Sequence, residues 1–279
     1  MLRLVESLSL PGDPTKPNED AFGGSERAAL VLDGATMLGD GLMPGPSDAA
    51  WIAQFGARRL IAHLNDEEPK KALRLAMGDA EKSFQALRRS EMYDQWRIPC
   101  ASLMLAAEHE KGLEFLYLGD CGALVEQRDG LKVIGETLDK RGEESARAAT
   151  LAREKKLPPA SALSRPEFLT HLRERRSRVN SGNYWLFSPD KRAAAHAVRR
   201  IVGIEKGAHL LLATDGLLAL VSDYGAYDAA GLLQAAKEKG LAALGEELRA
   251  IENGDADGNK FARFKKSDDA TALLLQVTD

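Results

Sequence analysis

The chain has 279 residues, a hydrophobic content of 44%, a charged content of 29% and a formal net charge of −4. These values are typical of an ordinary globular protein with a sizeable core. The acidic balance argues against a nucleic-acid-binding protein, whose surface is usually basic. Only two cysteines are present, so no disulfide framework is expected. No apolar stretch approaches 18 residues and the first residues lack a signal-peptide pattern, so we expect a cytoplasmic protein with no membrane partner.

Short apolar runs alternate with helical patterns along the chain. Runs bounded by Gly, Asp or charged residues predict buried strands, and spacing near 3.6 with a capping residue predicts helices. In chain order we expect a strand at 28–32, helices at 49–64 (capped by Ser47-Asp48) and 71–89, strands at 101–107, 113–118, 122–127 and 209–214, a helical pair from a cap at Asp228 through 252, and a strand at 270–277. Clustered strands with few crossover helices favour antiparallel sheets flanked by helices.

The segment 139–178 differs from the rest in composition. It holds eleven Lys or Arg against six acids, with Pro158-Pro159 in its middle. Its ends have a helical pattern and its centre is typical of a loop. A run of charge is most often a solvated face. A basic flap that receives a phosphorylated partner is the alternative.

Four short acidic segments lie at the ends of apolar runs. They are Asn18-Glu19-Asp20, Asp33-Gly34, Asp215-Gly216 and Asp268-Asp269. Taken singly, an Asp-Gly pair usually marks a turn. Carboxylates that converge at the rim of a sheet repel one another, and cations relieve that repulsion. Together the four segments therefore predict a site for a hard metal ion with oxygen ligands.

These motifs, in this order, resemble the metal-dependent type 2C (PPM) serine/threonine protein phosphatases. That family carries an N-E-D near its start, then D-G, G-D-S-R, S-D-G and a closing D-N or D-D, and the resemblance spans nearly the whole chain. It implies an α+β fold, a four-layer α-β-β-α sandwich of two mainly antiparallel sheets flanked by helices. It also implies one domain over 1–279, with a variable flap at about 139–178 beside the active site.

The resemblance implies a two-metal site for Mg²⁺ or Mn²⁺, with a third, weaker ion linked to the Asp of G-D-S-R. By this resemblance Asp33 is the bridging ligand and a catalytic residue, together with Asp215 and Asp268. The acids of Asn-Glu-Asp reach the second ion largely through water, as expected for small, strongly hydrated cations. The implied metal ligands are Glu19, Asp20, Asp33, Gly34 (through its carbonyl), Asp120, Asp215 and Asp268. Asp120 belongs to Gly119-Asp120-Cys121-Gly122, for which a hairpin turn is the alternative.

Two departures from the family pattern concern substrate capture and proton donation. The position of the family's phosphate-binding arginine holds Thr15, and we expect the adjacent Lys16 to bind phosphate as a point charge without bidentate geometry. Ala35 follows Asp-Gly where many members have a histidine, so that general acid is missing.

Other kinds of site are disfavoured. The segment 255–266 begins like an EF-hand loop but has Lys260 and Lys266 at positions that need Gly and Glu. No His or Cys spacing fits zinc, and no P-loop is present. Cys121 follows an aspartate, which opposes thiolate formation.

The leading hypothesis is therefore a metal-dependent phosphomonoester hydrolase that removes phosphate from phosphoserine or phosphothreonine in proteins, by direct attack of an activated water. The alternatives are a small-metabolite phosphatase of the same fold and a phosphatase-like module that binds a phosphorylated partner without turnover. The oligomeric state is left open.

Overall fold

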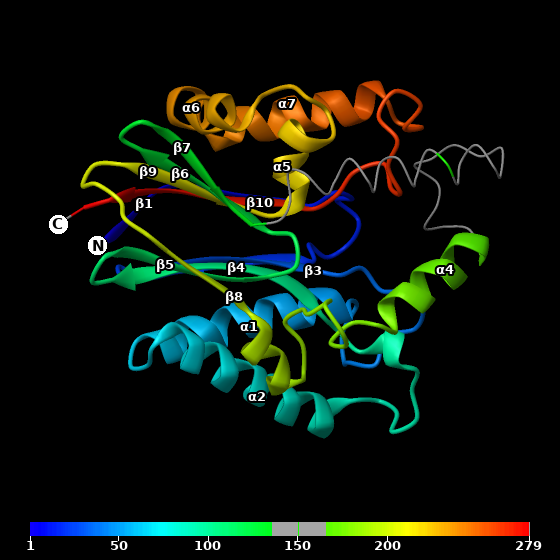
Figure 1. Ribbon diagram of the computed structural model, residues 1–279. Helices are drawn as coiled ribbons and strands as arrows, with labels where there is room; N and C mark the ends of the chain where they lie inside the picture. Colours follow the sequence, from blue (N-terminus) through cyan, green and yellow to red (C-terminus); the bar gives the residue numbers. More distant parts are fainter. Residues whose placement is uncertain (136–149, 151–165, 279) are drawn as a thin grey trace.

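The computed structural model describes residues 1–135, 150 and 166–278. Its strands form two antiparallel sheets of five strands each, packed face to face and covered on both outer sides by helices (Figure 1). The predicted four-layer α-β-β-α sandwich is confirmed.

The first sheet holds both ends of the chain. Its strand order is β1 (Leu2–Leu10), β10 (Ala270–Val277), β9 (His209–Ala213), β6 (Gly122–Gln127) and β7 (Gly130–Ile134). Its outer face is covered by α5 (Asp215–Ser222), α6 (Ala229–Lys239) and α7 (Leu241–Gly254). Because Leu2 pairs with Val277, the start of β10 and the residues just before it lie at the opposite end of the sandwich from the termini.

The second sheet has the order β2 (Asp20–Gly24), β3 (Ala28–Gly34), β4 (Ala101–His109), β5 (Gly112–Leu118) and β8 (Val198–Val202). Helices α1 (Asp48–Leu64) and α2 (Pro69–Leu87) cover its outer face. The remaining described helices are η1 (Gln95–Arg97), α4 (Pro166–Arg176) and η3 (Lys191–His196).

The central strands are apolar on both faces, which explains their unbroken apolar runs. In β3, Leu30 and Leu32 pack under the helices, whereas Ala29 and Val31 face the other sheet, and all four are buried. This alternation of directions along one strand supplies both the inter-sheet core and the sheet-to-helix core.

The predicted helices begin where their capping residues place them. The Ser47 hydroxyl accepts from the Ala50 N–H at the start of α1, and the Asp228 carboxylate accepts from the Gly231 N–H at the start of α6. These bonds satisfy backbone donors that a first helical turn leaves unpaired. The caps predicted at 47–48 and 228 are therefore confirmed.

Four strands, the short helix α5 and the short 3₁₀ helices η1 and η3 were not predicted. All four strands, β1, β2, β7 and β8, lie at sheet edges and carry exposed or polar residues, such as Arg199 and Arg200 in β8. Edge strands commonly carry charges that discourage pairing with other chains, and those charges mask the strand pattern. The short α5 begins at Asp215, where the sequence pattern indicated a turn.

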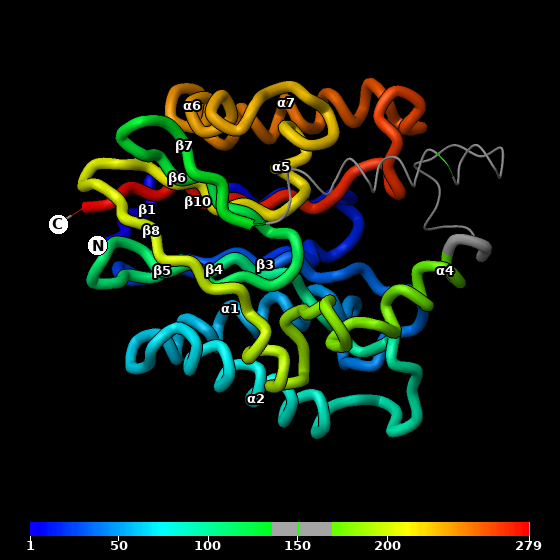
Figure 2. The backbone as a smooth tube through the Cα atoms, viewed as in Figure 1, coloured from blue at the N-terminus to red at the C-terminus, as the bar shows by residue number. Residues whose placement is uncertain are grey.

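The link from β5 to β6 corrects the hairpin alternative for residues 119–122. The two strands belong to different sheets, so Gly119, Asp120 and Cys121 carry the chain from one sheet to the other. Figure 2 follows this crossing in green. Gly119 has a φ of +77°, a value that glycine adopts without strain.

Most of the segment predicted as a basic flap, 139–149 and 151–165, lies outside the described residues. Its C-terminal part forms α4, in agreement with the helical pattern expected there. Among the residues that the structure describes, no helix is both long and apolar enough to cross a membrane.

Candidate metal centre

Two of the predicted acids are cross-strand partners at the end of the second sheet. Asp20 opens β2 and is directly opposite Asp33 near the end of β3. On its other side, Asp33 is opposite Ser102 of β4. Like charges placed directly across a ladder destabilise it, so this register is costly unless a cation compensates the charge.

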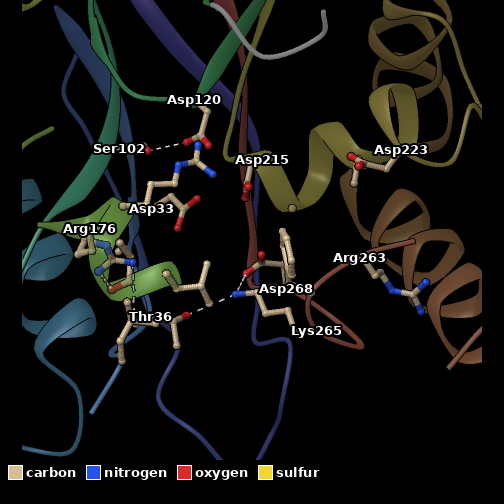
Figure 3. A pocket seen from close by; sticks show the side chains of 18 of the residues that line it. Asp33, Thr36, Ser102, Asp120, Arg176, Asp215, Asp223, Arg263, Lys265 and Asp268 are labelled. Carbon is tan, nitrogen blue, oxygen red and sulfur yellow. Dashed lines mark hydrogen bonds and ion pairs between the residues drawn. The ribbon is translucent and has the colours of Figure 1, made fainter. Parts of the chain in front are cut away.

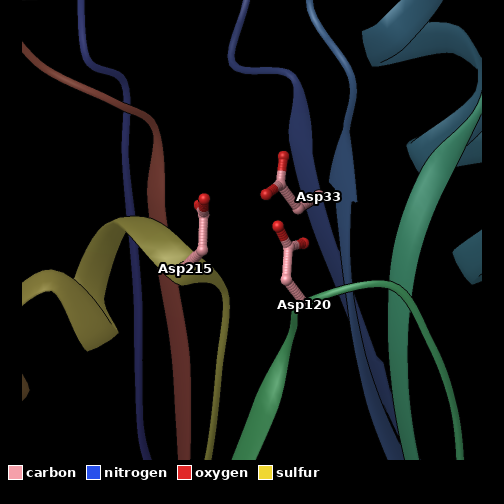
Figure 4. Close-up of side chains that lie close together, drawn as sticks. All are labelled: Asp33, Asp120 and Asp215. Carbon is pink, nitrogen blue, oxygen red and sulfur yellow. The ribbon is translucent and has the colours of Figure 1, made fainter. Parts of the chain in front are cut away.

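Asp120 and Asp215 complete a cluster with Asp33. One carboxylate oxygen from each residue lies within 4.8 Å of those of the other two. Figure 4 shows the three side chains pointing toward one another from the end of β3, the crossing before β6 and the start of α5. Three residues more than 80 positions apart in the sequence are thus brought together by the packing of the two sheets.

Burial and mutual repulsion dominate the electrostatics of this cluster. Burial, followed by the charges of Asp215 and Asp20, raises the pKa of Asp33 well above its usual range. The pKa of Asp20 is also raised well above its usual range, first by burial and then by Asp268 and Asp215, although the Thr214 hydroxyl acts against the shift. In the absence of a compensating cation, these carboxyls resist ionisation.

Asp20 is 4% exposed and only one of its oxygens is used. Thr214 Oγ1 donates to Asp20 Oδ2 at 2.8 Å, whereas Oδ1 is buried without a hydrogen-bond partner. A buried carboxylate oxygen without a partner is rare in native proteins. The clustered carboxylate oxygens are hard donors that repel one another, so these residues fit a divalent cation such as Mg²⁺ or Mn²⁺.

Glu19 is held by hydroxyl groups at the edge of the cluster. Thr36 Oγ1 donates to Glu19 Oε2 and Ser47 Oγ donates to Oε1, each at 2.6 Å. Asp120 is held in a similar way, by the Ser102 hydroxyl at 2.5 Å (Figure 3). Such bonds fix a carboxylate's orientation while leaving other lone pairs for a metal or its waters.

The adjacent acids Asp268 and Asp269 have different surroundings. Asp269 accepts backbone N–H bonds from Gly12 at 2.7 Å and from Glu19 at 2.6 Å, so it joins the start of β10 to the segment before β2. Asp268 instead forms an ion pair with Lys265 (Figure 3). Of the two acids, Asp268 is therefore the one that faces the cleft.

Glycine follows both Asp33 and Asp215 because the backbone is crowded there. A Cβ on Gly34 would lie 2.4 Å from the Ala49 carbonyl oxygen, and one on Gly216 would lie 1.9 Å from the Asp269 carbonyl oxygen. Neither pair forms a hairpin turn: one ends β3 and the other begins α5. These close approaches bring the surrounding backbone tightly around the acids.

A cleft of about 270 Å³ opens above the acids. Asp33, Asp120, Asp215 and Asp268 form part of its lining, and its cationic lining residues are Arg175, Arg176, Arg263 and Lys265. Burial lowers the pKa of Lys265, but Asp268, Asp33 and Asp215 offset this effect and the pKa lies above its usual range. Apolar and aromatic walls, including Leu172 of α4, surround the charged groups.

Lys16 and Thr15 lie outside the residues that line this cleft. The Lys16 side chain is 74% exposed and its Nζ is 3.4 Å from Asp13 Oδ2. Thr15 donates from both its N–H and its hydroxyl to Asp13 Oδ1. The cations that line the cleft come from α4 and from the segment before β10 instead.

Several residues of the site escaped the sequence analysis. No motif in the sequence marks Ser102, and Lys265 belongs to a Lys-Lys pair that is typical of an exposed loop. Thr214 does precede Asp215 where the family has Ser in its S-D-G, and this similarity was the one available signal.

No protein-family model and no curated protein sequence matches the chain. Solved structures match it over almost its whole length. The serine/threonine phosphatase PstP/Ppp of Mycobacterium tuberculosis has a TM-score of 0.60 and 17% identity, covering 100% of this chain and 99% of that one. The catalytic domain of serine/threonine protein phosphatase PstP in complex with two manganese ions has a TM-score of 0.56 and 18% identity, covering 100% of both. The PPM phosphatase MsPP from Mycobacterium smegmatis, in complex with cacodylate, has a TM-score of 0.51 and 16% identity, covering 99% of both. The chain therefore has the fold of the PPM serine/threonine phosphatases.

Proposed function

We propose that this protein is a metal-dependent phosphomonoester hydrolase of the type 2C class, which removes phosphate from phosphoserine or phosphothreonine in proteins. The observation that carries this proposal is the convergence of Asp33, Asp120 and Asp215 at the floor of a cleft. The shared fold, together with the serine/threonine phosphatase function of the similar structures, supports it.

The proposed ligands divide between two ions of Mg²⁺ or Mn²⁺, the number that the PstP complex contains for manganese. Asp33 would bridge them, with the Gly34 carbonyl and Asp215 and Asp268 on one side and Glu19 and Asp20 on the other. Asp120, beside Asp215, would serve a third ion. A metal pair supplies a water of lowered pKa and a clamp for phosphoryl oxygens.

The chain's own residues orient the acids and shape the cleft. Thr214 fixes Asp20 and Ser102 fixes Asp120 through hydroxyl donors, an arrangement that limits the motion of a ligand carboxylate. Arg175 and Arg176 bring positive charge to the same cleft, which favours entry of a phosphate dianion. We retain Lys16 as a predicted phosphate contact, although its side chain pairs with Asp13 in the structure.

The experiment is a pair of assays, one on a phosphoserine or phosphothreonine protein and one on p-nitrophenyl phosphate, each with Mn²⁺ and with EDTA. We expect hydrolysis of both only with metal. The variant Lys16→Ala reports the predicted phosphate contact through KM. Activity that persists in EDTA would contradict the metal mechanism, and hydrolysis confined to small phosphometabolites would replace the protein-phosphatase function with the metabolite alternative.

A further inference from the structure

Lys265 places an ammonium group inside the acidic site. It belongs to the segment between α7 and β10, and its Nζ pairs with Asp268 Oδ1. The same Nζ lies 3.4 Å from Thr36 Oγ1, and both contacts are drawn in Figure 3. The Lys265 side chain is 34% exposed, whereas the neighbouring Lys266 is exposed to solvent.

The contacts of Lys265 link acids from both sheets. Thr36, which follows β3, donates to Glu19 Oε2 at 2.6 Å, and Asp268 precedes β10. The ammonium therefore lies between two of the predicted metal ligands. Among the described residues, the close carboxylate group consists of Asp33, Asp120 and Asp215 without Asp268.

The segment that carries Lys265 is held in a defined conformation. The Asp255 carboxylate accepts from the N–H groups of Lys260 and Phe261, each at 3.0 Å, and from Arg263 Nη1 at 2.8 Å. Arg263 Nε in turn donates to the Lys266 carbonyl at 2.9 Å. These bonds within the segment that resembled an EF-hand loop fix the backbone on both sides of Lys265.

We propose that Lys265 is an internal cation that competes with a divalent metal ion for Asp268. This inference rests on the metal site of the proposed function. A divalent ion bound to Asp268 and an ammonium in contact with the same carboxylate would be close neighbours. Two positive charges so close together, in a half-buried setting, repel each other strongly. The metal must therefore displace Lys265, so the ion that Asp268 would hold together with Asp33 and Asp215 binds more weakly than it would without the ammonium.

The first test is calorimetric titration of Mn²⁺ into the wild type, Lys265→Met and the matched control Lys266→Met. We expect Lys265→Met to tighten one Mn²⁺ binding step by at least about fivefold. Lys266→Met should change it by less than about twofold, because an exposed charge is largely screened. Unchanged Mn²⁺ binding in Lys265→Met would overturn the proposal. Weaker binding would also overturn it, because Lys265 would then help Asp268 to bind the metal.

The second test needs no variant. Reductive methylation of the wild type, read by mass spectrometry at Lys265 with Lys266 as the internal reference, should be slow in EDTA and faster in Mn²⁺, because the metal frees the ammonium. Equal labelling in both conditions would contradict displacement. Both tests measure binding or labelling and do not depend on turnover. If the protein is inactive but gives both expected results, only the proposed function is refuted. If the protein is active but gives neither result, only the role of Lys265 is refuted.

Discussion

At the scale of single residues, the clustered acids of the cleft favour cation binding at the expense of the stability of the metal-free protein. Asp33 has a strongly raised pKa because it is buried beside Asp215 and Asp20. A buried carboxyl that must ionise near others weakens the folded state unless a cation binds. The same residues that the proposed reaction needs therefore lower the stability of the metal-free protein.

We expect Asp33→Asn to abolish hydrolysis and to stabilise the metal-free protein by on the order of 1 kcal/mol, because the amide keeps the shape and removes the repulsion. Asp215→Asn should act in the same direction. Turnover with Mn²⁺ and the melting temperature in EDTA measure the two effects. Asp257→Asn, at an exposed acid outside the site, is the control. Full activity of Asp33→Asn at saturating Mn²⁺ would contradict the ligand assignment.

At the scale of elements, α4 fastens the loop that follows the Asp33-Gly34 pair. Arg173 donates to the Leu38 carbonyl from Nε at 2.9 Å and from Nη2 at 2.6 Å, and its guanidinium lies 4.4 Å from the centre of the Trp96 ring. Arg176 donates to the carbonyls of Ala35 and Thr36. Arg175 lines the cleft and lies 6.0 Å from the Tyr184 ring centre.

These contacts give Arg173 and Arg175 different roles, whereas the basic-flap hypothesis gave all the arginines of this segment the same role. We expect Arg173→Glu to reduce hydrolysis of both p-nitrophenyl phosphate and a phosphoprotein, and to lower stability by about 1–2 kcal/mol, since it loses two hydrogen bonds and a cation–π contact. Arg175→Glu should slow phosphoprotein hydrolysis severalfold while changing p-nitrophenyl phosphate hydrolysis little, through lost steering.

Kinetics on both substrates at low and high salt decide between these roles. The effect of Arg175→Glu should shrink as salt rises. If Arg175→Glu impairs both substrates equally at every salt concentration, its role is structural. If neither substrate responds, this part of α4 is only a solvated face.

At the scale of the whole molecule, the acids shape how stability depends on pH. Burial and neighbouring charges raise the pKa values of Asp20 and Asp33 in the folded protein above the value of 3.8 expected when unfolded. The folded state thus binds more protons between those values, and stability falls as pH rises through that window. A bound cation counteracts the loss, because it favours the ionised carboxylates.

We therefore expect the metal-free protein to lose stability as pH rises from about 4 toward neutrality, with the loss reduced or reversed by Mn²⁺. Urea unfolding in EDTA and in Mn²⁺ across this range measures both curves. The double variant Asp20→Asn/Asp33→Asn should flatten the EDTA curve. Equal slopes for wild type and double variant would show that other groups govern the pH dependence.

The residue pattern was sufficient for antiparallel sheets flanked by helices, and the family resemblance added the four-layer sandwich and most of the converging acids. The β3 strand is buried on both faces, so successive positions carry apolar residues. This continuous apolar run can be recognised in the sequence. The edge strands were missed because their residues face solvent and lack a strong pattern. The path at Gly119 was left open because a Gly-Asp pair suits both a hairpin and a crossing between sheets.

What the sequence determined by itself was therefore the set of hydrophobic layers and the acids at their ends, because burial and capping depend on local residue type. Only the tertiary structure decided which groups meet. It placed Asp20 opposite Asp33, left an oxygen of Asp20 without a partner, set Lys16 beside Asp13, and brought Lys265 to Asp268. Those pairings depend on strand register and on how the sheets pack against each other, and residues far apart in the sequence carry no local signal of either.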